Sequence, residues 1–84
     1  MIVHTTITYK RNGDTLGSES RTFRGRWLAD AERKAMEYGE MSPLFPYASD
    51  LRILCEQPCG KTTSLCWLMG HTPAELPENL KQLA

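Results

Sequence analysis

The feature that most constrains the fold is an alternating run that ends in Asn12-Gly13. Along residues 2–10 the alternate positions form two sets, Val3, Thr5, Ile7 and Tyr9 on one face and His4, Thr6, Thr8 and Lys10 on the other. A period of two in β-branched and aromatic residues predicts a strand. Asn and Gly readily adopt the two positive φ values of a type I′ turn. The sequence therefore predicts a β-hairpin over residues 2–26, with its second strand at 15–26.

The second strand contains an irregularity in its pattern. A two-residue turn places Tyr9 opposite Leu16 and Ile7 opposite Ser18. Leu16 and Phe23 have opposite parity, so a regular strand would put only one of them in the core. A β-bulge near Gly17 would bring both to the core face, and we predict one there.

A helical period follows at residues 28–38. Leu28, Ala31, Ala35 and Tyr38 recur at helical spacing, and charged residues occupy the opposite side. Gly39 is a natural C-terminal cap. The two alanines allow the helix to lie close to a sheet.

Alternation returns in a second predicted hairpin over residues 51–69. Its strands join at a turn around Pro58–Lys61, and the tail over 72–84 begins with the capping-box form Thr72-Pro73-Ala74-Glu75. We therefore expect a short helical tail. The fold class is α+β, in the order ββαββ, with a four-stranded antiparallel sheet and one helix packed on one face.

Length and composition limit the classes of protein that fit this chain. Its 84 residues suit a single domain over 1–84, and ten basic residues balance ten acidic ones. No apolar run approaches the roughly 18 residues of a membrane span. The start of the chain lacks a signal-peptide layout, and three cysteines do not suit a secreted disulfide framework. We expect a cytoplasmic protein without membrane contact.

Two motifs have the composition of cofactor sites. Cys55, Cys59, Cys66 and His71 could supply four zinc ligands, but structural sites usually place their first pair two residues apart. The hairpin is expected to put Cys55 and Cys66 on one face, as core or free thiols. Gly60-Lys61-Thr62 ends like a phosphate-binding loop, yet an apolar strand follows it where a helix is needed. We predict no metal and no cofactor.

Basic residues gather in the second strand. Arg21, Arg24 and Arg26 are interleaved with Phe23 and Trp27, a composition that suits phosphate contacts and base stacking. The alternative is a solvated strand face whose charge nearby glutamates balance.

The last strand is apolar on both faces. We expect Leu54, Leu65, Trp67 and Met69 on the face that the helix does not cover. Either the leucines of the tail fold back over that face, or part of it stays open for a second chain. The tail leucines are Leu76, Leu80 and Leu83.

The layout over residues 2–69 resembles that of several very small phage or mobile-element proteins, including some anti-CRISPR proteins. The likeness is one of element order and size around an Asp-Ala-Glu-Arg-Lys-Ala helix, and it carries no functional residue over. Double-stranded-RNA-binding-like domains share the same element order. It implies an inhibitor that covers the surface of a larger complex.

No arrangement of residues marks a catalytic centre, since neither His4 nor His71 has a neighbour typical of a general base. The sequence therefore predicts a non-catalytic protein-binding module, with a protein partner or a second copy as its ligand. The alternative is a nucleic-acid-binding module that uses the arginine and aromatic residues, with or without zinc at the three cysteines and His71. The predicted binding residues are Arg21, Arg24, Arg26 and Trp27 on one surface and Leu65, Trp67 and Met69 on another.

Overall fold

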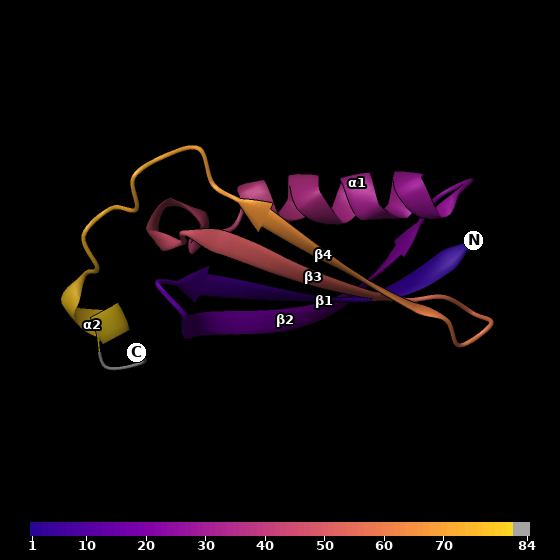
Figure 1. The fold of residues 1–84 in the computed structure, drawn as a ribbon, viewed down its shortest axis with the longest axis horizontal. Helices are drawn as coiled ribbons and strands as arrows, with labels where there is room; N and C mark the ends of the chain where they lie inside the picture. The colour runs from indigo at the N-terminus through magenta and orange to yellow at the C-terminus, as the bar shows by residue number, and fades with distance from the viewer. Residues whose placement is uncertain (82–84) are drawn as a thin grey trace.

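A computed structural model describes residues 1–81, and the side chains of residues 1–79. It has one four-stranded antiparallel sheet in the order β2-β1-β3-β4, with helix α1 packed across one face (Figure 1). The ββαββ prediction is confirmed. The elements are β1 (Ile2–Arg11), β2 (Asp14–Arg24), α1 (Leu28–Glu40), a short 3-10 turn (Phe45–Tyr47), β3 (Asp50–Glu56), β4 (Thr62–Leu68) and α2 (Glu78–Lys81).

The first hairpin turns at Asn12 and Gly13, whose φ angles of 49° and 91° confirm the predicted turn. Tyr9 pairs with Gly17, whereas Lys10 pairs with Thr15, so Leu16 is an extra residue on β2. The predicted bulge is confirmed. Because of it, the expected pairing of Tyr9 with Leu16 is wrong by one residue, and Leu16 is buried in the core.

Helix α1 lies very close to the sheet because small residues face it. Ala31 and Ala35 are fully buried. Gly39 is also buried, and a Cβ there would lie 3.1 Å from Leu51 Cδ1. The prediction that Gly39 caps the helix is wrong, since α1 continues through it to Glu40. The glycine instead leaves room for the Leu51 side chain.

The register of the second hairpin differs from the one that the alternating sequence pattern predicts. Gln57 N–H donates to the Lys61 carbonyl at 2.8 Å, and Gly60 has a φ of 91°. This three-residue turn sets Glu56 opposite Thr62, so positions of equal parity share a face. Leu65, Trp67 and Met69 therefore lie on the helix side and pack against the core. The prediction that they lie on the uncovered face is wrong.

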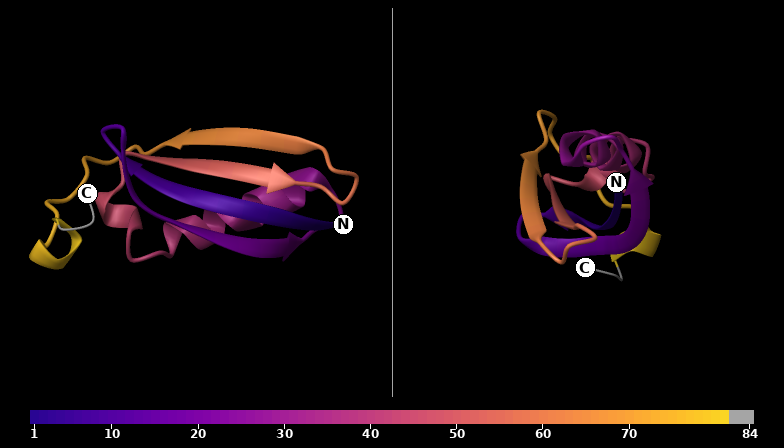
Figure 2. Two further views of the ribbon diagram at one scale, coloured as in Figure 1. Left: turned by 90° about the horizontal axis from the view of Figure 1, so that it is seen from below. Right: turned by 90° about the vertical axis from the view of Figure 1, so that its right-hand side faces the viewer.

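The tail packs at the end of the sheet. Ala74 N–H donates to the Pro46 carbonyl at 2.9 Å, and Leu76 packs against the core. No helix follows the predicted capping box at Thr72, since α2 begins only at Glu78. Figures 1 and 2 show α2 beyond the end of the sheet, so the described tail does not cross the uncovered face. The side chain of Leu80, and Leu83 altogether, lie outside the described residues.

Candidate binding surfaces

The sheet face opposite α1 is here called the open face, and it is turned toward the viewer in the left view of Figure 2. Its side chains are mostly hydroxyls, with one imidazole and a few charges. Three large apolar residues interrupt them, Ile2, Leu54 and Leu68, which are 45%, 46% and 75% exposed. Along the strands the open face includes Ile2, His4, Thr6, Thr8, Lys10, Ser18, Ser20, Thr22, Arg24, Arg52, Leu54, Glu56, Thr62, Ser64, Cys66 and Leu68.

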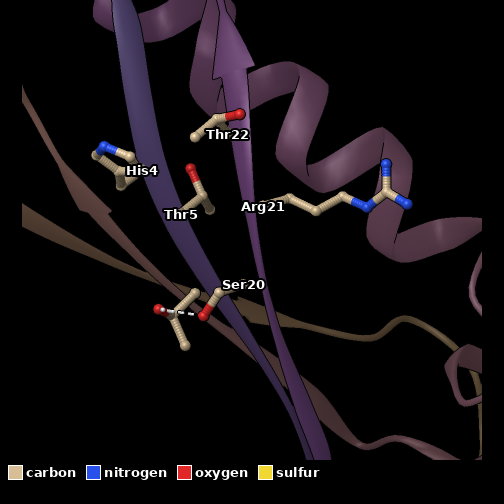
Figure 3. Close-up of a pocket in the computed structure, with 6 residues that line it drawn as sticks. His4, Thr5, Ser20, Arg21 and Thr22 are labelled. Carbon is tan, nitrogen blue, oxygen red and sulfur yellow. Dashed lines mark hydrogen bonds between the residues drawn. The ribbon is translucent and has the colours of Figure 1, made fainter.

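A shallow hollow of about 710 Å³ lies on the open face where β1 meets β2 (Figure 3). His4, Ser20 and Thr22 line it, and Thr6 Oγ1 lies 3.3 Å from Ser20 Oγ. Such hydroxyls can donate or accept hydrogen bonds with a polar ligand. Arg21 borders the hollow, but Figure 3 shows its side chain directed toward α1.

Arg21 is separated from the other predicted arginines. Its guanidinium carbon lies 4.5 Å from the centre of the Tyr38 ring, on the helix side. Both Tyr38 and Tyr9 donate hydrogen bonds to Glu19, at 3.1 and 2.8 Å. Burial raises the pKa of Tyr9 to about 12, and Glu19 adds to the rise. These contacts bind β2 to the helix and to the core.

Arg24, Arg26 and Trp27 lie at the junction between β2 and α1. A Cβ on Gly25 would lie 2.8 Å from the backbone nitrogen of Ala31, so this tight entry into the helix requires glycine. Arg24 pairs with the exposed Ile2 on β1. We call Ile2, Arg24, Arg26 and Trp27 the junction surface.

Trp27 is the most unusual residue of the junction surface. It occupies the N-cap of α1 without a side-chain capping hydrogen bond, and its side chain is 65% exposed. Ser, Thr, Asp or Asn at this position would stabilise the helix by about 1 kcal/mol relative to a residue that cannot cap. Local stability therefore does not account for a tryptophan here.

The register of β4 places the second predicted surface on the helix side of the sheet. Leu65, Trp67 and Met69 are half-buried, and the Trp67 ring lies 6.1 Å from that of Phe45. Their packing against the core is structural, and a binding role for their exposed parts stays a prediction. The sequence does contain a signal for this register. Pro58 and Gly60 are typical of a three-residue turn, and a turn of that length sets which residues of β3 and β4 face each other.

The free edge of β4 carries backbone groups that point outward. The Gln57–Lys61 bond and the bond from Met69 N–H to the Ser49 carbonyl orient the odd-numbered residues toward β3. Since N–H and C=O groups alternate in direction along an antiparallel strand, the even-numbered residues point away from the sheet. Within residues 1–81, β4 pairs with β3 alone. The outward groups belong to Thr62, Ser64, Cys66 and Leu68.

The cysteines do not come together. Cys55 is buried in the core, where burial raises the pKa of its thiol, whereas Cys66 lies on the open face. The expectation that the two share a face is wrong, for the reason of register given above. Cys59 lies in the hairpin turn, and His71 lies against Phe45 beyond β4. Among the described side chains, no group of three or more His, Cys, Asp or Glu residues could hold a metal ion.

Within residues 1–81, no helix has the length and hydropathy needed to cross a membrane. Comparisons with protein-family models, with curated proteins and with solved structures find no match for this chain.

Proposed function

We propose that this protein is a non-catalytic protein-binding module and that the junction surface is its binding site. The observation that carries the proposal is the exposed indole of Trp27, at a helix position where a capping residue would be more stable. A large apolar ring left in water becomes favourable when a partner covers it.

The composition of the junction surface fits recognition of another protein. Trp and Arg are the residues that most often dominate the binding energy of protein interfaces. Arg24 and Arg26 are both exposed, and Lys34 Nζ donates to the Arg24 carbonyl, which brings a third basic group alongside. Asp30 is the acidic residue of the first turn of α1. The net positive charge favours a partner with an acidic surface.

A module of this size acts by covering part of a larger partner. That mode of action suits a phage- or mobile-element-encoded inhibitor or modulator of a host complex. The uncovered side of α1 and the junction surface lie at the outside of the fold, where such a partner has access (Figure 1).

Affinity capture from a lysate of the source cells tests the site. The bait proteins are the wild type, Trp27→Ala, Arg26→Glu, and Met41→Ala, the last being a control at an exposed residue just after α1. We expect the wild type and Met41→Ala to retain the same protein, and the other two to lose it. Equal retention by all four would show that the partner binds elsewhere.

Nucleic acid is the second candidate ligand, because an exposed indole next to arginines can stack on a base while the arginines contact phosphates. A Trp67→Phe variant leaves Trp27 as the single fluorescent tryptophan. Titration with an oligothymidylate should then quench the fluorescence, with an affinity that falls steeply with salt. Absence of quenching at low salt removes this candidate and leaves the protein ligand.

A further inference from the structure

We propose that β4 pairs antiparallel with β4 of a second copy of this chain, about a two-fold axis beside Leu65. The two four-stranded sheets then form one continuous sheet of eight strands. This interface uses a surface separate from the junction surface and does not depend on the proposed function.

The backbone supplies the first argument. The outward N–H and C=O groups of β4 belong to alternate residues of a seven-residue strand. With Leu65 opposite Leu65 of the second copy, Ser64 lies opposite the partner's Cys66 and Thr62 opposite the partner's Leu68. Every outward-pointing residue then faces another, so each N–H has a carbonyl to bind.

The absence of charge supplies the second argument. Residues 62–70 contain no Asp, Glu, Lys or Arg, so two copies meet without like-charge repulsion. Sheet edges that stay single usually carry lysines, other charges or bulges. An antiparallel pair of identical strands is self-complementary, and two-fold homodimers are the commonest oligomers. A second copy is therefore the occupant that this edge fits.

The side chains supply the third argument. On the helix side, Thr63 comes opposite the partner's Trp67, and Leu65 meets its own copy, so the apolar layer continues across the join. On the open face, Leu68 is 75% exposed in the single chain and gains the partner's Thr62 as a neighbour. The half-buried residues of β4 lose solvent contact in the same step.

Proline substitution tests the pairing. Ser64→Pro removes an outward N–H and no bond to β3, and such positions on edge strands tolerate proline. The matched control is Thr22→Pro, because the paired bonds between Met1 and Gly25 orient Thr22 outward on β2. By sedimentation equilibrium we expect the wild type and Thr22→Pro at twice the 9.5 kDa of one chain, and Ser64→Pro at 9.5 kDa.

Cross-linking decides the register even if a proline variant unfolds. Ser64→Cys in a Cys59→Ser background places that thiol opposite the partner's Cys66, at a Cα separation of about 5.5 Å that a disulfide spans. Diamide should convert this variant into a covalent dimer. The control, Ser20→Cys on β2 in the same background, should stay monomeric on non-reducing denaturing electrophoresis. A wild type that is monomeric at all concentrations, or cross-linking equal at both positions, overturns the proposal.

Discussion

The two edges of the sheet differ in how they meet solvent. β2 carries Asp14, Glu19, Arg21 and Arg24 along its length, and the bulge at Leu16 interrupts its regular pairing. β4 is regular and carries no charged residue. Charges and bulges are the devices that keep an edge strand from pairing with another chain. One edge of this molecule has them, and the other does not.

The edges also differ in how they are fixed to the rest of the fold. Glu19 on β2 accepts hydrogen bonds from Tyr9 and Tyr38, which ties the strand to both the neighbouring strand and α1. β4 is held by β3 and by the packing of Leu65, Trp67 and Met69 on the core. The difference teaches that β2 has the charges and the bulge that keep an edge strand single, whereas β4 lacks both and can be extended by a second chain.

The largest expected effect concerns the direction of the backbone groups of β4. Leu65→Pro removes a hydrogen bond to β3 and should lower the free energy of unfolding by about 3 kcal/mol. Ser64→Pro, one residue earlier, should lower it far less. Urea denaturation in dilute solution, where the chain is monomeric, measures both. Equal destabilisation by the two variants would contradict the assigned directions of the backbone N–H groups of β4. The proposed difference between the two edges of the sheet would then lose its basis.

Trp67 tests how β4 is held to the core. Trp67→Ala removes packing against Phe45 and should cost about 2 kcal/mol, less than a fully buried tryptophan because the ring is half-buried. Thermal or urea unfolding measures the loss. If stability is unchanged, Trp67 is a surface residue and β4 is fixed in another way.

The burial of Tyr9, whose hydroxyl donates to Glu19 on β2, predicts a pH dependence of stability. Burial keeps the Tyr9 hydroxyl protonated in the folded state up to a pKa of about 12, whereas the unfolded chain loses this proton near the usual tyrosine pKa of 10.0. The folded state therefore binds more protons in this window, so the free energy of unfolding should fall as the pH rises from 10 to 12. Tyr9→Phe should remove this part of the fall. A Tyr9→Phe protein with the same alkaline profile as the wild type would contradict the burial of the Tyr9 hydroxyl in the folded state.

The smallest expected change in the free energy of unfolding comes from replacing Trp27, and it has the opposite sign to the change at Trp67. Trp27→Asn supplies a capping side chain to α1 and should raise the free energy of unfolding by about 0.5–1 kcal/mol, while Trp67→Ala lowers it. Trp27→Asn should also abolish capture of the partner protein. A loss of stability would mean that Trp27 supports the fold and would weaken the proposed binding site.

The sequence predicted the local structure well where period and turn chemistry agree. The alternation before Asn12-Gly13 and the opposite parity of Leu16 and Phe23 were enough for the first hairpin and its bulge. The helix was found from its spacing. Its end was misplaced, because Gly39 is there for contact with Leu51 rather than for capping, and that contact is tertiary.

The candidate surfaces were harder to predict, because a shift of one residue in register moves every side chain to the other face. The second hairpin was identified, yet its three-residue turn was not, so Leu65, Trp67 and Met69 were assigned to the wrong side. Arg24, Arg26 and Trp27, which the sequence predicts as binding residues, are exposed, and their binding role stays a prediction. The direction of the free N–H groups on β4 depends on the turn bonds at Gln57 and cannot be obtained from composition.

Residue-resolved hydrogen exchange tests the difference between the edges most directly. The outward amides of β4 at Ser64 and Cys66 should be more than about tenfold better protected in concentrated than in dilute solution, because dimerisation buries them. The outward amides of β2 at Ser20 and Thr22 should exchange quickly at both concentrations. Protection that is independent of concentration at Ser64 and Cys66, or that rises equally on both strands, would contradict the account.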